Sequence, residues 1–442
     1  MLTAHELYPL LLAFLQAGRL VAHATARRSV ADHLAALLCA QSLRASPRAR
    51  SLLSAGSVPA RQRLRRVARA LVRPSLAPAT LSPRLVRAAI RLLRHAGVGP
   101  EPGRPWLVAL DSVRCHSWEL FTLGVVAWGR TLPIGWAVLP YPWPKGRFTP
   151  TVCALLEQVG VSWPLGEPVA LLADRAFPSK ALFTTLRRYG WQWTVRLQGR
   201  HAVEFLDERR CRVRELVAGR RPPGGWDTYA VTFGAGSKLR GTLMIGPGLP
   251  VIPVHQAGQA SLAARARQAG RRAQHAATKH PGRSTVSYDA WVVLFSTETD
   301  PLVADAQYRS RWGIEGTYRD AQGGWDGTQG WALEPTLARV KKAAQVEALA
   351  GQWALGVLVQ TWLGLRLESS AVGQQARKRW ATTARLSVWA RGKFALADPD
   401  PALQAWVRAT LEEGARVLED APDPIIWYQR PATASAPEQE AA

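Results

Sequence analysis

The chain has 442 residues, of which 47% are hydrophobic, so it can bury a substantial core and is not a wholly disordered polymer. It carries 57 lysines and arginines against 32 aspartates and glutamates, a net charge of +25. A surface this basic attracts polyanions, and nucleic acid is the commonest such partner. The four cysteines are far apart and form no C-x-x-C pair, which argues against a zinc site or a disulfide framework and fits a reducing cytoplasm.

Residues 1–100 are predicted to form a basic helical region that faces DNA. They hold sixteen arginines, no lysine and only two acids. In the stretch 61–71 the apolar residues share one helical face and several arginines share another. The apolar face holds Leu64, Val67 and Leu71, and the basic face holds Arg61, Arg65 and Arg69. The basic face either contacts phosphates or is simply solvated.

After a Gly- and Pro-rich linker at about 97–105, strand-like and helix-like segments alternate. Strands are predicted at 107–111, 120–128 and 131–139, a helix at about 149–159, a strand at 169–173, a helix near 179–188 and a strand at 191–197. The short connections between the first three strands predict antiparallel neighbours, and the later strand-helix-strand order favours parallel pairing. The sequence therefore predicts an α/β fold with a mixed sheet.

The alternation of strands and helices stops at residues 199–287, which contain Gly/Pro clusters and short strand-like runs at 229–233 and 242–245. This segment is predicted to be a β-rich insertion. A strand at 291–295 resumes the main sheet. Asp300 then caps one helix from Pro301 to about Gln322, with proline at its first position.

Two further helical regions are predicted, at 334–368 and near 374–388. The apolar stretch 343–365 is interrupted by three glutamines and a glutamate, so it is predicted to be a buried helix and not a membrane span. The tail after Arg430 is rich in Ala, Pro and Glu and is expected to be disordered.

Three acidic residues, Asp111, Asp174 and Glu315, are candidate metal ligands because of where they lie in the predicted elements. Asp111 and Asp174 each end an apolar, strand-like run, and Glu315 shares one helical face with Tyr308 and Arg311. Two Mg²⁺ ions about 3.5–4 Å apart can activate a nucleophile and stabilise a leaving oxygen in phosphodiester cleavage, and Mg²⁺ prefers carboxylate ligands. Taken singly, an aspartate that ends a strand is more often a turn residue or a helix cap, so the prediction rests on the three acids together. Arg311 can also simply pair with Glu315 four residues on.

The segment 308–315 resembles the Y-x2-R-x3-E-x6-K signature of bacterial insertion-sequence DDE transposases. Asp174-Arg175-Ala176-Phe177 is similar to the second-aspartate motif of that family, and Leu107-Val108-Ala109-Leu110-Asp111 to the first. The segments 330–334 and 384–388 are also similar, so that the resemblance covers about 20–395. It departs from the family at Gln322, which stands at the lysine position, and at Val113, which stands where a threonine is usual. Either a nearby basic residue such as Arg319 substitutes for the lysine, or binding of the element end is weaker, or this copy has decayed.

The resemblance implies a ribonuclease-H-like α/β fold, a mixed sheet with a β-rich insertion, flanked by N- and C-terminal helical regions. The expected domains are the DNA-binding region 1–100, the first part of the catalytic domain at 101–198, the insertion at 199–287, the last strand and glutamate helix at 288–330, the C-terminal helices at 331–429 and the tail at 430–442.

The resemblance also implies cut-and-paste transposition, in which water attacks at the element end and the freed 3′-OH then attacks target DNA. Asp111, Asp174 and Glu315 would bind two Mg²⁺ ions, or Mn²⁺ in their place. Tyr308 and Arg311 would grip a phosphate, with Arg319 and Gln322 as further DNA contacts. Trp291 would either receive a flipped base or serve as a core tryptophan.

The expected partners are double-stranded DNA, both terminal inverted repeats and target, and a second copy of the chain in the DNA complex. No membrane partner is expected, and the location would be the cytoplasm, at the nucleoid. Two alternatives are a catalytically impaired, transposase-derived DNA-binding protein, which Gln322 favours, and a structure-selective ribonuclease-H-like nuclease that cleaves branched DNA.

Overall fold

The computed structural model describes residues 2–55, 57–70, 73–164, 166–218, 225–234, 239–247, 291–322, 333, 336, 340–380 and 387–420. The chain divides into two compact units. The first comprises Met1–Ala173, Ala181–Trp193 and Gln307–Ala442, and the second comprises Asp174–Lys180 and Thr194–Ala306. The predicted tail at 430–442 and much of the predicted insertion, at 248–290, lie outside the described residues.

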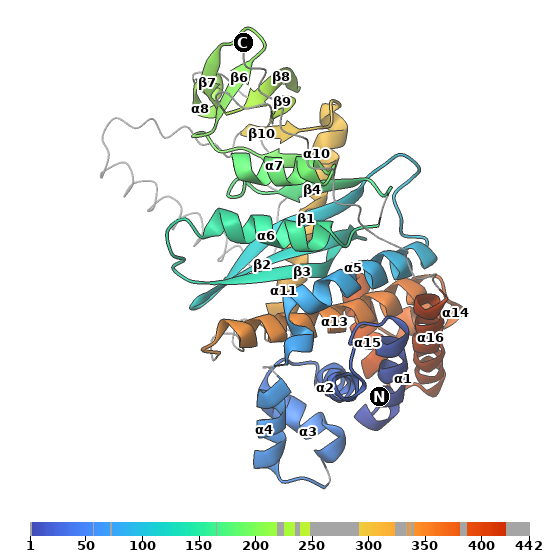
Figure 1. Cartoon of the computed structure of the whole chain (residues 1–442). Coiled ribbons are helices and arrows are strands. Elements are labelled where there is room, and N and C mark those ends of the chain that lie inside the picture. The colour runs from blue at the N-terminus through green and yellow to red at the C-terminus, as the bar shows by residue number, and fades with distance from the viewer. Residues whose placement is uncertain are drawn as a thin grey trace, which may run out of the picture. The chain divides into compact units, whose positions relative to one another are not determined.

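The N-terminal region is helical, as predicted. It contains α1 (Ala4–Ala17), α2 (Ala24–Ala40), α3 (Ala45–Ser51), η1 (Leu53–Ala55), α4 (Ala60–Ala70), η2 (Pro74–Leu76) and α5 (Pro78–His95) (Figure 1). Helix α1 begins at a capping box in which Thr3 and Glu6 satisfy each other's backbone N–H groups.

The two faces of α4 are only partly as predicted. The arginine face is exposed, and Val67 is buried in a cluster with Ala36 and Leu52. Leu64, which shares the predicted apolar face, is however 39% exposed, so that face is not buried along its whole length. The buried stripe of this helix is narrow, Val67 and Ala70 only, and Leu64 lies one turn before it. Leu71 lies outside the described residues.

The first unit holds four strands in the order β3-β2-β1-β4. These are β1 (Trp106–Cys115), β2 (Trp118–Ala127), β3 (Arg130–Pro140) and β4 (Val169–Ala173). The first three pair antiparallel, and β4 pairs with β1 in parallel. Helices α6 (Phe148–Gly160) and α7 (Lys180–Arg188) follow β3 and β4, so the alternation read from the sequence is confirmed.

The second unit, which resumes at Thr194 within β5, contains the rest of the sheet, in the order β5-β10-β9-β8-β6-β7. Its elements are β5 (Gln192–Arg196), β6 (Ala202–Phe205), β7 (Arg210–Arg212), α8 (Val213–Val217), β8 (Asp227–Phe233), β9 (Arg240–Pro247) and β10 (Trp291–Ser296). The strands predicted as an insertion extend the sheet, because β9 pairs antiparallel with β10. The described strands, ten in all, make the fold a mixed α/β sheet with flanking helices, consistent with a ribonuclease-H-like fold.

The remaining helices are α10 (Pro301–Ser310), α11 (Trp312–Gln322), α13 (Ala343–Glu368), α14 (Ala371–Arg379), α15 (Val388–Ala397) and α16 (Pro401–Glu419). The expected helix near 374–388 is wrong, since α14 ends at Arg379 and Ser387 caps a separate α15 by accepting a hydrogen bond from Ala390 N–H at 3.1 Å.

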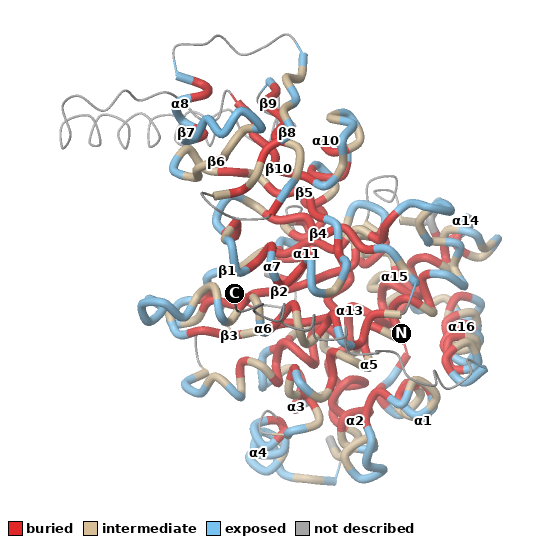
Figure 2. Tube along the Cα trace, turned by 45° about the horizontal axis from the view of Figure 1, so that its top comes forward, coloured by how far each residue is buried: buried red, intermediate tan, exposed pale blue. Residues whose placement is uncertain are grey.

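Helix α13 is a core helix, as predicted. Among the described helices it is the one long and apolar enough to cross a membrane, yet its most apolar window is entirely buried inside the fold (Figure 2). The indole N–H of Trp136, on β3, donates to the carbonyl of Glu347 at 2.9 Å and so ties α13 to the sheet.

Candidate active site

Asp111 does not end its strand. Strand β1 continues to Cys115, so the prediction of a strand end there is wrong. What ends at this point is the pairing with β4, whose last register pair is Leu110 with Ala173. Pairing with β2 continues, with Asp111 opposite Thr122, and this keeps the backbone extended beyond the apolar run. The Oδ1 atom of Asp111 accepts a hydrogen bond from Ser112 N–H at 2.8 Å.

Asp174 does follow a strand end. Strand β4 is buried at all five residues and stops at Ala173. The carbonyl of Asp174 then accepts a hydrogen bond from Phe177 N–H at 3.1 Å, which closes a turn. Leu110 and Ala173 are register partners in a parallel pair, and each is followed directly by one of the two aspartates.

The single helix expected from Pro301 to Gln322 is broken at Arg311. Helix α10 ends at Ser310 and α11 begins at Trp312. Across the break Arg311 N–H donates to the Tyr308 carbonyl at 3.1 Å, and Ile314 N–H donates to the Arg311 carbonyl at 3.0 Å. These bonds span three residues, the tight turn of a 3₁₀-helix, so the motif residues sit on two helices and the turn between them.

Helix α11 is held against the β2–β3 hairpin. A side chain at Gly313 would place its Cβ atom 3.1–3.2 Å from backbone atoms of Arg130, so glycine permits the close approach. Arg130 pairs with Asp320 at 2.7 Å, and Thr317 Oγ1 accepts from Thr131 N–H at 2.9 Å. The helix that carries Glu315 is thereby fixed to the strands of its own unit.

The guanidinium of Arg311 joins two of the predicted acids. Its Nη1 atom donates to Asp111 Oδ2 at 2.9 Å and its Nη2 atom to Glu315 Oε1 at 2.8 Å. Arg311 is 5% exposed and lies 5.6 Å from the ring centroid of Tyr308, which is itself buried. Tyr308 is therefore placed to hold Arg311 and does not face solvent.

Tyr318 is a site residue that the sequence reasoning missed. Its hydroxyl donates to the Asp111 carbonyl at 3.3 Å. Burial, and next the nearby Asp111 carboxylate, raise the pKa of this phenol well above its usual range, so it stays a neutral donor. The available signal was its spacing three residues after Glu315, which puts both on one helical face.

The donor types at this site fit a divalent cation, because Mg²⁺ prefers carboxylate oxygens. Within the described residues no group of three metal-ligating side chains is gathered closely enough to hold an ion. The carboxylates of Asp111 and Glu315 both form ion pairs with the guanidinium of Arg311. A cation bound to both carboxylates would compete with that guanidinium.

The other two residues predicted to contact DNA, Arg319 and Gln322, both lie on α11. Arg319 is exposed on α11, one turn after Glu315. Gln322 is the last residue of α11, and its side chain lies outside the described part of the chain. Of the similar segments, 330–334 is described at residue 333 alone and 384–388 at residues 387 and 388.

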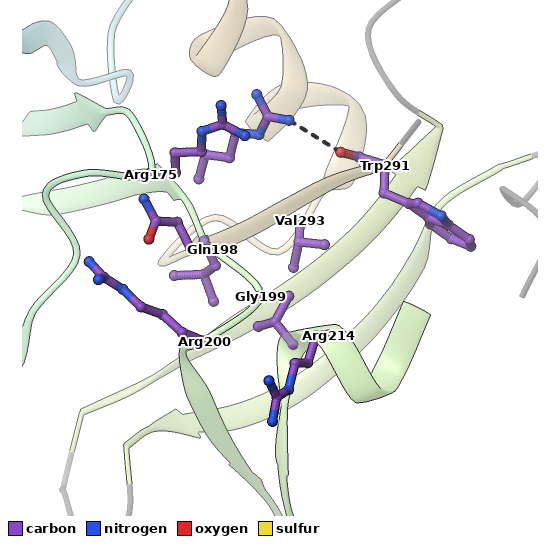
Figure 3. A pocket seen from close by; sticks show the side chains of 10 residues that line it. Arg175, Gln198, Gly199, Arg200, Arg214, Trp291 and Val293 are labelled. Carbon is purple, nitrogen blue, oxygen red and sulfur yellow. Dashed lines mark hydrogen bonds between the residues drawn. The ribbon is translucent and has the colours of Figure 1, made fainter. Parts of the chain in front are cut away.

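The second unit contains a basic hollow of about 490 Å³ next to the turn that follows Asp174 (Figure 3). Four arginines line it: Arg175, Arg196, Arg200 and Arg214. Trp291 opens β10 as predicted and is 4% exposed, and its carbonyl accepts from Arg196 Nη2 at 3.4 Å. Its indole ring extends away from the guanidinium groups in Figure 3.

Residues 149–328 match the family model described as "Transposase DDE domain". The matched family is a transposase family. The match includes Asp174, Trp291, Arg311 and Glu315 and begins after Asp111. It supports the predicted DDE transposase family without testing the finer signature. A comparison with curated proteins gives no match.

Proposed function

We propose that the protein is a DNA transposase that cleaves DNA at the ends of its element and joins the freed ends to target DNA by a cut-and-paste route. The observation that carries the proposal is the convergence of Asp111 and Glu315 on Arg311, in a chain whose residues 149–328 match a transposase DDE domain. Asp174, directly after β4, supplies the third carboxylate.

Asp111, Asp174 and Glu315 would hold two Mg²⁺ ions, or Mn²⁺. Bound ions of this kind supply activation of the attacking oxygen and stabilisation of the leaving oxygen. The chain's own groups position the carboxylates: Tyr318 donates to the backbone of Asp111, and Arg311 bridges two acids. Arg311 would exchange a carboxylate for a DNA phosphate, a geometry that suits a guanidinium, while Tyr308 holds it in place.

DNA contacts in this proposal extend beyond the carboxylates. Arg319 is exposed beside Glu315, Gln322 ends the same helix, and the hollow around Arg200 and Arg214 offers further positive charge. Trp291 would stack on a displaced base only after its buried ring becomes accessible. The substrates would be double-stranded terminal repeats and target DNA, bound by a homodimer in the cytoplasm, at the nucleoid.

The test is cleavage of a linear DNA that carries the inverted repeats flanking the coding region. Glu315→Gln, Asp111→Asn and Asp174→Asn are expected to lower the cleavage rate by on the order of 10³-fold or more, because lost metal ligands remove several kcal/mol of transition-state stabilisation. Binding of the same DNA should change little. Glu412→Gln, an exposed acid on α16, is the matched control. Wild-type cleavage by Glu315→Gln would disprove the assignment.

A second candidate is a transposase-derived protein that binds DNA without cutting it. It is favoured by Gln322, which puts no charge where the resembling family has lysine. The same assay separates the two, since wild-type binding without cuts in either Mg²⁺ or Mn²⁺ supports this candidate and cleavage excludes it.

A further inference from the structure

Helix α11 carries Glu315 on one face and a stripe of residues that contact the β2–β3 hairpin on another. The stripe consists of Gly313, Gly316, Thr317 and Asp320, which stand at i, i+3, i+4 and i+7. At about 100° of turn per residue, Glu315 lies roughly on the far side of the helix from Gly313. The place of Glu315 therefore depends on how this stripe packs against the hairpin.

Three members of the stripe contact one residue of the hairpin, Arg130. A Cβ atom on Gly313 would lie 3.1 Å from the Arg130 carbonyl carbon, and one on Gly316 would lie 2.9 Å from Arg130 Nη1. The Oδ2 atom of Asp320 accepts a hydrogen bond from Arg130 Nε at 2.7 Å. The Nη1 atom of the same guanidinium donates to the Gly129 carbonyl at 2.9 Å. Arg130 therefore contacts α11 along about two turns of the helix.

Asp320 has a second partner, on a different helix. The hydroxyl of Ser387 donates to Asp320 Oδ2 at 3.0 Å, and it accepts from Ala390 N–H at 3.1 Å to cap α15. Asp320 thus joins three elements, namely α11, strand β3 and the start of α15. Arg130 and Ser387 both lie outside the residues 149–328 that match the transposase family, so the junction connects the matched segment to the rest of the first unit.

The contacts of Asp320 hold α11 more firmly than Glu315 itself is held. The Asp320 side chain is 16% exposed, and its bond from Arg130 is charge-assisted, which makes it stronger than a neutral hydrogen bond. Glu315 is 43% exposed and pairs with Arg311. That pair is lost when Arg311 turns to a DNA phosphate, as the proposed function requires. The packing of α11 on the hairpin is then what keeps Glu315 near Asp111.

We propose that Asp320 is a positioning residue for the metal site. Through Arg130 and Ser387 it fixes the rotation of α11 and thereby the place of Glu315 relative to Asp111. This inference rests on the proposed function in taking Glu315 as a metal ligand. Residues that orient a metal ligand contribute roughly 10–100-fold to metal affinity without touching the ion. Asp320 does so from about one and a half turns further along the helix that carries the ligand.

The test measures Mn²⁺ binding to the full chain without DNA, from the electron paramagnetic resonance signal of free Mn²⁺. Asp320→Asn keeps the shape of the side chain and removes its charge. The matched control is Glu413→Gln, which breaks a part-buried ion pair of the same 2.7 Å length between Arg366 on α13 and Glu413 on α16. The binding that disappears in Glu315→Gln defines the site.

Asp320→Asn is expected to raise the Mn²⁺ dissociation constant of this site by about tenfold, whereas Glu413→Gln should change it by less than about twofold. Thermal unfolding reports whether each variant is folded. A merely structural role would lower the melting temperature and leave the dissociation constant of the folded molecules unchanged. A folded Asp320→Asn chain with wild-type Mn²⁺ affinity overturns the inference.

Ser387 offers a second comparison. Ser387→Thr keeps a hydroxyl that can donate to Asp320, whereas Ser387→Asp still caps α15 but has no proton to donate. Ser387→Thr should bind Mn²⁺ as wild type does, and Ser387→Asp should bind it about threefold more weakly or worse. Equal affinities in these two variants would overturn the part of the inference that involves α15.

The outcomes also separate this inference from the proposed function. A wild-type chain that cuts element ends, while Asp320→Asn keeps the wild-type Mn²⁺ affinity, leaves the transposase proposal standing and removes the role of Asp320. A chain that binds Mn²⁺ through Glu315 and Asp320 yet cuts no element end leaves the role of Asp320 standing. Mn²⁺ binding that is unchanged in Glu315→Gln removes both.

Discussion

The guanidinium of Arg311 lies 2.9 Å from the carboxylate of Asp111, a residue 200 positions earlier in the chain. The same guanidinium lies 2.8 Å from Glu315. The two acids proposed to bind metal thus share one internal cation, which offsets one of their two negative charges. Because the arginine is almost completely buried and Glu315 is partly exposed, the bridge combines a strong contact with one that solvent can weaken.

Replacing Arg311 with glutamine should therefore expose a competition between guanidinium and metal. Without metal, Arg311→Gln is expected to lower the free energy of unfolding by about 3 kcal/mol, because Asp111 and Glu315 both lose their ion pair with this buried guanidinium. With Mg²⁺ present, the melting temperature of the variant should rise more than that of wild type, since the ion binds both carboxylates without displacing an arginine.

Thermal unfolding with and without Mg²⁺ measures both effects. Arg188→Gln is the matched control, because Arg188 pairs with Glu157 on an exposed surface. Equal Mg²⁺-induced shifts in wild type and Arg311→Gln would mean that the two carboxylates do not share an ion.

The contact between α13 and α15 predicts a second sensitive position. A Cβ atom at Gly364 would collide with the carbonyl of Val388, and one at Gly392 with the carbonyl of Gln360. Gly364→Ala should force the helices apart and lower the free energy of unfolding by about 1–3 kcal/mol or more, since backbone atoms cannot rotate away. Urea unfolding measures the change. Gly225→Ala, whose Cβ would meet nothing within 4 Å, should be nearly neutral, and comparable losses in both variants would refute the packing argument.

The sequence predicted most elements whose signal is local. Strand β4 was predicted with its observed bounds, because five consecutive apolar residues sit between turn residues. The long buried helix α13 was predicted from its composition, although its start was placed too early. The mixed α/β sheet followed from the order of such segments.

What the sequence did not reveal depends on contacts between distant segments. Asp111 lies within β1 because β2 continues to pair with that strand, and a single-strand pattern carries no such information. No proline marks the break between α10 and α11 at Arg311, so the helical spacing of the side chains predicted one continuous helix. The bridge from Arg311 to Asp111 arises only when α11 docks on the sheet, whereas the pair with Glu315 was visible as an i, i+4 spacing.

Burial of His33 should make the free energy of unfolding depend on pH. Burial, and next the charges of Arg48 and Arg73, lower the pKa of this histidine to about 3. Its ordinary pKa is about 6.5, so between those values the unfolded chain binds a proton that the folded chain excludes. The free energy of unfolding should therefore fall as pH falls below about 6.5, by up to about 1.4 kcal/mol per pH unit for this group.

Urea unfolding of wild type and His33→Leu at several pH values tests this directly. The variant should lose stability less steeply between about pH 6.5 and pH 4, because one titrating group is gone. His23→Leu, at an exposed position, is the control and should keep the wild-type slope. Identical slopes in wild type and His33→Leu would show that His33 does not resist protonation.

The last prediction concerns the stability cost of Arg48, a fully buried cation whose hydrogen-bond partner is the neutral side chain of Gln352. Its Nη2 atom donates to Gln352 Oε1 at 2.5 Å, while its Nε and Nη1 atoms find no hydrogen-bond partner in the described part of the chain. Burial lowers the pKa of this guanidinium to about 10, which corresponds to a cost on the order of 3 kcal/mol to the folded state. Apolar replacement of both partners, Arg48→Met/Gln352→Leu, should therefore raise the free energy of unfolding, whereas Gln352→Leu alone should lower it by leaving the charge without its acceptor.

Urea unfolding compares these variants with Arg50→Met, which replaces an exposed arginine on the same helix α3 and should be nearly neutral. A double variant less stable than wild type would mean that the buried guanidinium has favourable partners in solution. Loss of the Arg48 charge should also raise the pKa of His33 and narrow the pH range over which that histidine destabilises the fold.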